Sequence, residues 1–157
     1  MPSNLDSSAI VKYYVTEPGS AWVREQVDGG DVILLSEVTM VEVAAALGIL
    51  HRMGRITSRH RRGLWERFEH DCVERYDLMP VVHDVIYAAA RLCANHPLRA
   101  YDALQLAAGL ALRRPLAVEG APLVFVSADD ALVSAAESEG LAVDNPFWHT
   151  DLDAHNA

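Results

Sequence analysis

Four acidic residues stand at points where the chain changes from one expected element to the next. They are Asp6 in LDSSAIVKYY, Glu42 in SEVTMVEVAAAL, Asp102 in RAYDALQLA and Asp129 in VFVSADDAL. Carboxylates that converge repel one another strongly unless protons or a hard metal ion neutralise them. If the fold brings these four together, they form a pocket for a divalent cation.

Each of these acids also has a simpler structural interpretation. Asp6, Asp102 and Asp129 each suit a helix N-cap, where a carboxylate accepts hydrogen bonds from free backbone amides. Glu42 stands three residues after Thr39, which is the spacing of a capping box. The apolar neighbours of two of these acids weaken the capping interpretation. Glu42 interrupts the apolar run MVEVAAALGIL, and Asp102 directly precedes the apolar segment ALQLAAGLAL. A lone carboxylate is costly to bury unless it is paired or protonated.

Strand-like and helix-like segments alternate along the chain. Short apolar runs predict strands at 3–5, 32–35, 78–82, 123–128 and 141–143. Helical spacing of apolar residues predicts helices at 9–15, 19–27, 39–53, 58–75, 84–96, 102–113 and 130–139. Pro115 is expected to end the sixth of these helices. Because hairpin signals are missing, the pattern predicts an α/β fold with a parallel sheet covered on both faces.

This topology places some of the acids but not all of them. Ligands of parallel sheets bind beyond the carboxyl ends of the strands. Asp6 follows the first expected strand and Asp129 the fourth, so both should lie at that edge. Glu42 lies one turn into the helix after the second strand and can lean back over the same edge. Asp102 begins a helix with no strand directly before it, so periodicity does not place it.

Length, charge and the absence of sorting signals limit the class of protein. At 157 residues and 51% hydrophobic, the chain suits one globular domain, which we expect at 1–146 with a tail at 147–157. A net charge of −9 argues against non-specific coating of nucleic acid. The start MPSNLDSS is no signal peptide and ALQLAAGLAL is too short to cross a membrane, so we expect a cytoplasmic protein. Cys72 and Cys93 are expected to be reduced, buried thiols.

Two polar segments leave alternatives open. The segment HRMGRITSRHRRGLWER holds six of the 13 Lys and Arg residues: Arg52, Arg55, Arg59, Arg61, Arg62 and Arg67. This segment could bind the phosphates of RNA or an acidic protein partner, because guanidinium groups bind phosphate and carboxylate equally well. The third alternative is a solvated helix face without a partner. The tail carries potential metal ligands, namely His149, Asp151, Asp153 and His155. We expect it to be a loosely ordered polar terminus instead.

Four motifs together resemble PIN-domain ribonucleases, and most closely the VapC-type toxins of bacterial toxin–antitoxin pairs. LDSSAIVKYYVTEPGS, SEVTMVEVAAAL, LRAYDALQLAAGLAL and VSADDALVSAAESEGL occur in the order and approximate spacing of that family, from Asn4 to Pro146. The resemblance implies a three-layer α/β/α fold with a central parallel sheet. It also implies an acidic pocket that holds Mg²⁺ or Mn²⁺ and cleaves single-stranded regions of RNA.

The resemblance assigns roles to individual residues. The four acids that bind the metal and carry catalysis match Asp6, Glu42, Asp102 and Asp129. Asp130 competes for the last role, but Asp129 stands two residues after Ser127, where the family usually has Ser or Thr. Ser8 matches a small hydroxyl residue two positions after the first acid, and we expect it to orient a carboxylate or a water.

The resemblance implies partners as well as an activity. If the habits of the family hold, the protein is a homodimer, silenced by an antitoxin whose tail supplies an arginine or other group to the acidic pocket. The predicted function is a metal-dependent endoribonuclease, in which a metal-bound water attacks the scissile phosphorus. The acidic charge and the short first strand suggest an alternative, a PIN-like protein-interaction module with little or no turnover.

Overall fold

The computed structural model of the protein describes residues 1–118 and 120–155, and within them the strands form a single sheet. The strands are β1 Ser3–Leu5, β2 Ile33–Ser36, β3 Tyr76–Met79, β4 Val124–Val126 and β5 Ala142–Asp144. All neighbours pair in parallel, in the order β3-β2-β1-β4-β5. The predicted parallel sheet is therefore confirmed.

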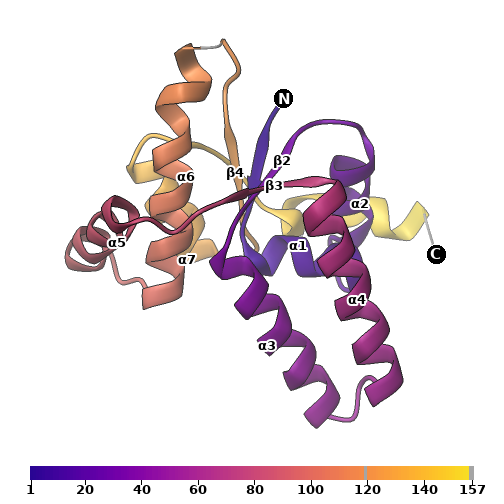
Figure 1. The fold of residues 1–157 in the computed structure, drawn as a ribbon. Coiled ribbons are helices and arrows are strands. Elements are labelled where there is room, and N and C mark those ends of the chain that lie inside the picture. The colour runs from indigo at the N-terminus through magenta and orange to yellow at the C-terminus, as the bar shows by residue number, and fades with distance from the viewer. Residues whose placement is uncertain (119, 156–157) are drawn as a thin grey trace.

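Helices cover both faces of this sheet (Figure 1). They are α1 Ser7–Tyr14, α2 Ser20–Asp28, α3 Val38–Arg52, α4 Ser58–Glu74, α5 His83–Asn95, α6 Ala100–Val118 and α7 Asp130–Ser138, followed by a 3₁₀ helix, η1, at Pro146–His155. Successive strand side chains alternate between the faces. Leu5 and Val126 join the core beneath α1 to α4, whereas Phe125 joins the core beneath α5 to α7. These layers confirm the α/β/α architecture.

Two of the predicted boundaries that differ from the structure involve proline. The third strand lies at Tyr76–Met79 and not at 78–82, because Pro80 has no N–H to donate to a neighbouring strand. Helix α6 continues to Val118, past its expected end at Pro115. A proline near the end of a helix removes only one hydrogen bond of the ladder, so it does not fix where the helix ends. Within the described residues, no helix is long and apolar enough to cross a membrane.

The C-terminal segment is ordered against α2, contrary to the expectation of a loose tail. His149 stacks on Trp22 with ring centroids 4.5 Å apart, and its Nε2 lies 2.7 Å from the Asp144 carboxylate. Asp153 accepts hydrogen bonds from the backbone N–H groups of Gly19 and Ala21 at the start of α2. These contacts satisfy free amides of that helix. The division of the chain into a domain at 1–146 and a tail at 147–157 stays a prediction.

The only lysine of the chain lies beneath this C-terminal segment. Lys12 is 3% exposed, and its Nζ lies 3.2 Å from a Glu17 oxygen and 4.3 Å from the centre of the Phe147 ring. A buried ammonium group needs such an ion pair because desolvation disfavours its charge. Lys12 therefore ties α1 to the loop before α2 and to η1.

Candidate active site

Asp6 links the central strand to the first helix. Its backbone N–H donates to the Val126 carbonyl of β4 at 3.0 Å, and its side chain caps α1 by accepting from Ala9 N–H at 2.9 Å. The carboxylate is nearly fully buried, at 3% exposure of the residue. Burial raises the pKa of Asp6 to about 6, the hydrogen bonds that it accepts oppose this rise, and the charge of nearby Glu42 adds to it.

Two serine hydroxyls hold the Asp6 carboxylate in place. Ser8 Oγ donates to Asp6 at 2.7 Å and accepts from the N–H of Ala128 at 2.9 Å. Ser127, which directly follows β4 and is fully buried, donates to Asp6 Oδ2 at 2.7 Å and accepts from the N–H of Asp129 at 3.0 Å. The two hydroxyls thus join the first acid to the loop that carries the fourth.

The neighbouring acids Asp129 and Asp130 face different groups. Asp129 caps α7 through Oδ1, which accepts from two backbone N–H groups, and its Oδ2 lies 3.9 Å from Arg99 Nη2. Asp130 is exposed and accepts from Asn145 Nδ2 at 3.0 Å, beside the end of β5. The backbone N–H of Asp129 and the carboxylate of Asp6 bind the same Ser127 hydroxyl, whereas the Asp130 carboxylate binds Asn145. The assignment of Asp129 as the fourth acid stays a prediction.

Asp102 is not the N-cap of its helix, contrary to one of the interpretations of its sequence. It is the third residue of α6, and its Oδ2 accepts from both the backbone N–H and Nε of Arg99, at 3.3 and 3.4 Å. Arg99, whose side chain is 87% exposed, thus lies between the carboxylates of Asp102 and Asp129. An exposed guanidinium group of this kind partly offsets the repulsion between two acids.

Glu42 does not form a capping box with Thr39. Helix α3 begins one residue earlier than Thr39, so Thr39 lies inside the helix, where its buried hydroxyl accepts from Gln105 Nε2 at 2.9 Å. The same nitrogen donates to Glu42 Oε2 at 2.6 Å. Glu42 also lines an open depression of about 390 Å³ with Ser7, Val41 and residues of α3 and α6. Sequence reasoning missed Gln105, although a polar residue one turn after Asp102 in an apolar helix is a usable signal.

Three kinds of contact relate the four acids to one another: shared hydrogen bonds, an ion pair and charge repulsion. Asp6 and Asp129 share Ser127, Asp102 and Asp129 share Arg99, and Glu42 influences the charge of Asp6. In the described part of the chain, no three acidic, His or Cys side chains already form a group that could hold a metal. The donors that the four acids offer are carboxylate oxygens, which is the chemistry that Mg²⁺ and Mn²⁺ require.

The sequence model of the PIN domain matches residues 4–137, which is most of the chain. The protein belongs to the PIN domain family. No curated protein sequence matches it significantly. The family match and the parallel α/β sheet agree with the fold that the sequence motifs implied.

Solved structures share the fold of this PIN domain at low sequence identity. FitAcB from Neisseria gonorrhoeae has a TM-score of 0.65 and 20% identity, covering 94% of this chain and 99% of its own. VapBC2 from Rickettsia felis, solved with a DNA fragment from its promoter, has a TM-score of 0.60 and 12% identity, with coverages of 92% and 98%. A toxin–antitoxin complex from Klebsiella pneumoniae has a TM-score of 0.55 and 12% identity, with coverages of 92% and 97%. At such identities the likeness shows the fold.

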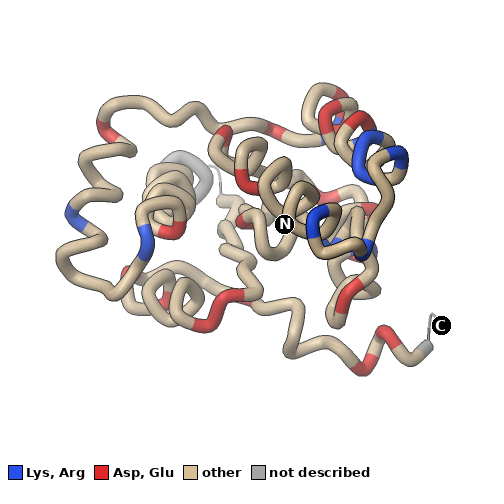
Figure 2. The backbone as a smooth tube through the Cα atoms, turned by 90° about the horizontal axis from the view of Figure 1, so that it is seen from below, with Lys and Arg blue, Asp and Glu red and all other residues tan. Residues whose placement is uncertain are grey.

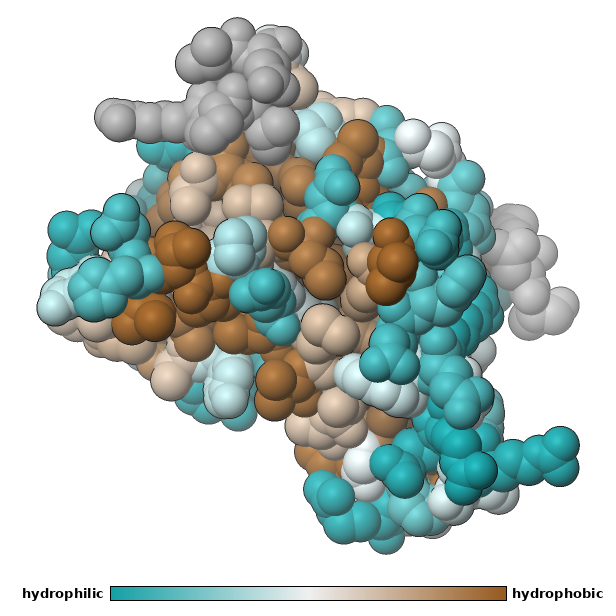
Figure 3. Space-filling view, in the orientation of Figure 1, coloured by the Kyte–Doolittle hydropathy of each residue, from teal (hydrophilic) through white to brown (hydrophobic). Residues whose placement is uncertain are grey.

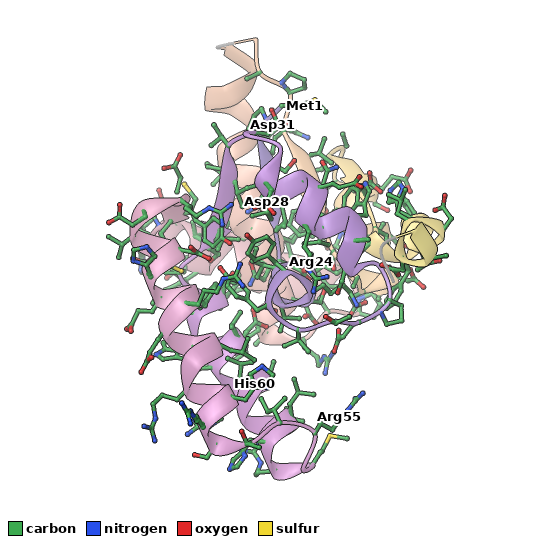
Figure 4. All side chains as sticks on the ribbon, turned by 90° about the vertical axis from the view of Figure 1, so that its right-hand side faces the viewer. Met1, Arg24, Asp28, Asp31, Arg55 and His60 are labelled. Atoms are coloured by element: carbon green, nitrogen blue, oxygen red, sulfur yellow. The ribbon has the colours of Figure 1, made fainter. Side chains whose placement is uncertain are left out.

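Arginines gather at the tip of the α3–α4 hairpin, which projects from the body of the PIN domain (Figures 1 and 2). Figure 4 shows Arg55 and His60 at this tip, well away from Asp28 and Arg24 on α2. We call this surface the arginine tip and define it by five exposed residues: Arg52, Arg55, Arg59, Arg61 and Arg62. Within the described residues none of the five pairs with an acid, whereas Arg67 donates to the Tyr13 hydroxyl at 3.3 Å.

Proposed function

We propose that this PIN domain is a Mg²⁺- or Mn²⁺-dependent endoribonuclease and the toxin of a toxin–antitoxin pair. The buried Asp6 carboxylate carries the proposal. It lies at the carboxyl edge of the central strand, its pKa is raised to about 6, and the charge of Glu42 contributes to that rise. A site that disfavours a carboxylate's charge and holds further acids nearby is one that a divalent cation would stabilise.

The four acids would hold the ion: Asp6, Glu42, Asp102 and Asp129. When bound, the ion would acidify a water for attack on the scissile phosphorus and offset charge on the phosphoryl oxygens. The chain itself supplies orientation, because Ser8 and Ser127 fix the Asp6 carboxylate from two sides. Arg99 lies beside two of these acids and is largely exposed, so its guanidinium group is placed to meet a phosphate of the substrate.

A cleavage assay tests this proposal. Structured and single-stranded RNAs are incubated with the protein in Mg²⁺, Mn²⁺ or excess EDTA, beside Asp6→Asn and Asp102→Asn. Asp130→Asn is the matched control, because Asp130 is an exposed acid beside the pocket whose carboxylate binds Asn145. We expect cleavage that needs the metal, is lost in the first two variants and persists in the control. Cleavage in EDTA, or in Asp102→Asn, would contradict the proposal. RNA left uncut under every condition, with tight binding to a small cognate protein, would favour the interaction module.

We also propose that the arginine tip contacts RNA phosphates. Unpaired arginines that project from a chain of net charge −9 can bind a polyanion without competition from internal ion pairs. Binding of a single-stranded RNA by the Asp6→Asn protein should weaken on Arg55→Ala or Arg59→Ala. Each lost contact should reduce the dependence of log affinity on log salt by about 0.7. Arg91→Ala, at an exposed arginine of α5, is the control. Equal RNA affinities in all variants would contradict this proposal and would favour an acidic protein as the partner of the arginine tip.

Two kinds of protein partner belong to the proposal. The Klebsiella pneumoniae structure of similar fold is a toxin–antitoxin complex, which supports an antitoxin as partner. We place this pair in the cytoplasm as part of the proposal. A homodimer is supported by large hydrophobic residues that are exposed on or directly after α3, α5 and α6: Val41, Ile49, Met53, Ile86, Tyr87 and Tyr101. Figure 3 shows apolar side chains in brown on the side of the molecule where α5 lies. Light scattering after size-exclusion chromatography should give twice the mass of 17.2 kDa, and Ile86→Lys should shift it to the monomer.

A further inference from the structure

Gln105 occupies an unusual position for an amide. It lies on α6, one turn after Asp102 and on the same face, and it is 1% exposed. Its Nε2 donates to Glu42 Oε2 at 2.6 Å and to Thr39 Oγ1 at 2.9 Å. The side chain therefore connects α6, which carries the third acid, to α3, which carries the second.

The orientation of this amide is fixed by the charge of its partner. An ionised carboxylate only accepts hydrogen bonds, so the NH₂ group and not the carbonyl oxygen must face Glu42. The reversed amide would bring two oxygens within 2.6 Å of each other. A short hydrogen bond from an amide to a carboxylate is also stronger than one between neutral groups. Gln105 thus holds Oε2 of Glu42, a carboxylate that the proposed function assigns to the metal.

Packing alone does not account for the choice of glutamine. Gln105 Oε1 is buried and has no hydrogen-bond partner among the described residues. An unpaired buried carbonyl is unfavourable, and a methionine would fill almost the same volume without it. The residues around Gln105 on its own helix, Leu104 and Leu106, are apolar. The benefit that offsets this cost lies in the hydrogen bonds of the NH₂ group, one of which goes to a proposed metal ligand.

We propose that Gln105 is a positioning residue of the acidic pocket, which acts through Glu42 and sets its carboxylate relative to Asp102. This inference rests on the proposed metal-dependent nuclease function. Outer contacts to metal-ligating carboxylates commonly change metal affinity or activity by about 10- to 100-fold when they are removed. Thr39 accepts the second hydrogen bond of the same NH₂ group and so has a smaller role of the same kind.

The test uses Gln105→Met, which keeps the volume and removes both hydrogen bonds. Two measurements are made, Mn²⁺ binding by titration calorimetry and the kinetics of RNA cleavage. We expect Mn²⁺ affinity or kcat to fall by about 10- to 100-fold, with KM changed less than about threefold. Thermal unfolding should show no loss of stability, because the unpaired carbonyl is also gone. Leu112→Met, at a buried position near the other end of α6, is the control and should match the wild type.

A double-mutant cycle separates positioning from a general effect on the fold. If Gln105 acts through Glu42, Gln105→Met should have little further effect on Mn²⁺ affinity in a Glu42→Gln background. An equal loss in both backgrounds, or wild-type affinity and kcat in the single variant, would overturn the inference. The wild type tests the proposed function on its own. If it neither binds Mn²⁺ nor cleaves RNA, the proposed function is wrong and the role of Gln105 is wrong as well.

Discussion

Replacing Asp6 by asparagine is expected to make the metal-free protein more stable while it abolishes cleavage. Burial raises the pKa of this carboxyl from 3.8 to about 6. A rise of that size means that the ionised group destabilises the folded protein by about 3 kcal/mol at neutral pH. Because Asp6 is only 3% exposed, solvent screening reduces this figure little. Asparagine carries no charge and keeps an oxygen that accepts from Ala9 N–H.

The sign of the pH dependence follows from proton binding. Between pH 3.8 and about 6 the folded protein holds the Asp6 proton more tightly than the unfolded chain does. The contribution of this group to stability is therefore fully present below pH 3.8 and is lost as the pH rises through about 6. Rearranged hydrogen bonds to Ser8 and Ser127 will cost the variant part of its gain. We expect Asp6→Asn to exceed the wild type by about 1–3 kcal/mol at pH 7 and by almost nothing below pH 4.

Urea unfolding in EDTA, followed by circular dichroism at several pH values, measures this difference directly. Asp130→Asn serves as the control, because it removes an exposed charge beside the same pocket. Addition of Mn²⁺ at pH 7 should stabilise the wild type and not Asp6→Asn, since only a folded carboxylate pocket binds the ion. A variant that is less stable than the wild type at pH 7, or a difference that does not change with pH, would refute the reasoning.

Three further substitutions have definite expected outcomes. Asp102→Asn should reduce cleavage more than about 100-fold and change the free energy of unfolding by less than about 1 kcal/mol, as measured by RNA cleavage and urea titration. Asp153→Ala should lower the free energy of unfolding by about 1 kcal/mol, because the backbone N–H groups of Gly19 and Ala21 lose their acceptor; an unchanged urea midpoint would contradict this. Gly109→Ala should destabilise by about 1–3 kcal/mol, since a Cβ there would lie 2.8 Å from Asn4 Oδ1 and 2.9 Å from Phe125 Cδ2; a wild-type melting temperature would refute it.

Local sequence predicted those parts of the fold that depend on local chemistry. The order and type of the elements followed from apolar periodicity, and the placement of Asp6 and Asp129 followed from the strands before them. Both residues are indeed N-caps, and the capping role does not conflict with a pocket. One oxygen of each carboxylate satisfies the helix, which leaves the other to contact Ser127 in one case and Arg99 in the other.

Contacts between distant residues could not be predicted in this way. Thr39 and Glu42 have capping-box spacing, yet the hydroxyl and the carboxylate both bind Gln105, which lies more than 60 residues later. The C-terminal segment has a polar composition that is typical of loose termini, but Asp153 finds free amides at the start of α2. In both cases a polar partner that is brought close only by the fold decides the outcome.

The burial of Lys12 makes the docking of the C-terminal segment chemically visible. The chain has a single ε-amino group, and in the folded protein it lies under the Phe147 ring and against Glu17. Reagents that acylate amines can reach this ε-amino group only when its cover lifts. The rate at which Lys12 is modified therefore reports the opening of η1, and a partner protein that displaces or clamps this segment would change that rate without any engineered probe.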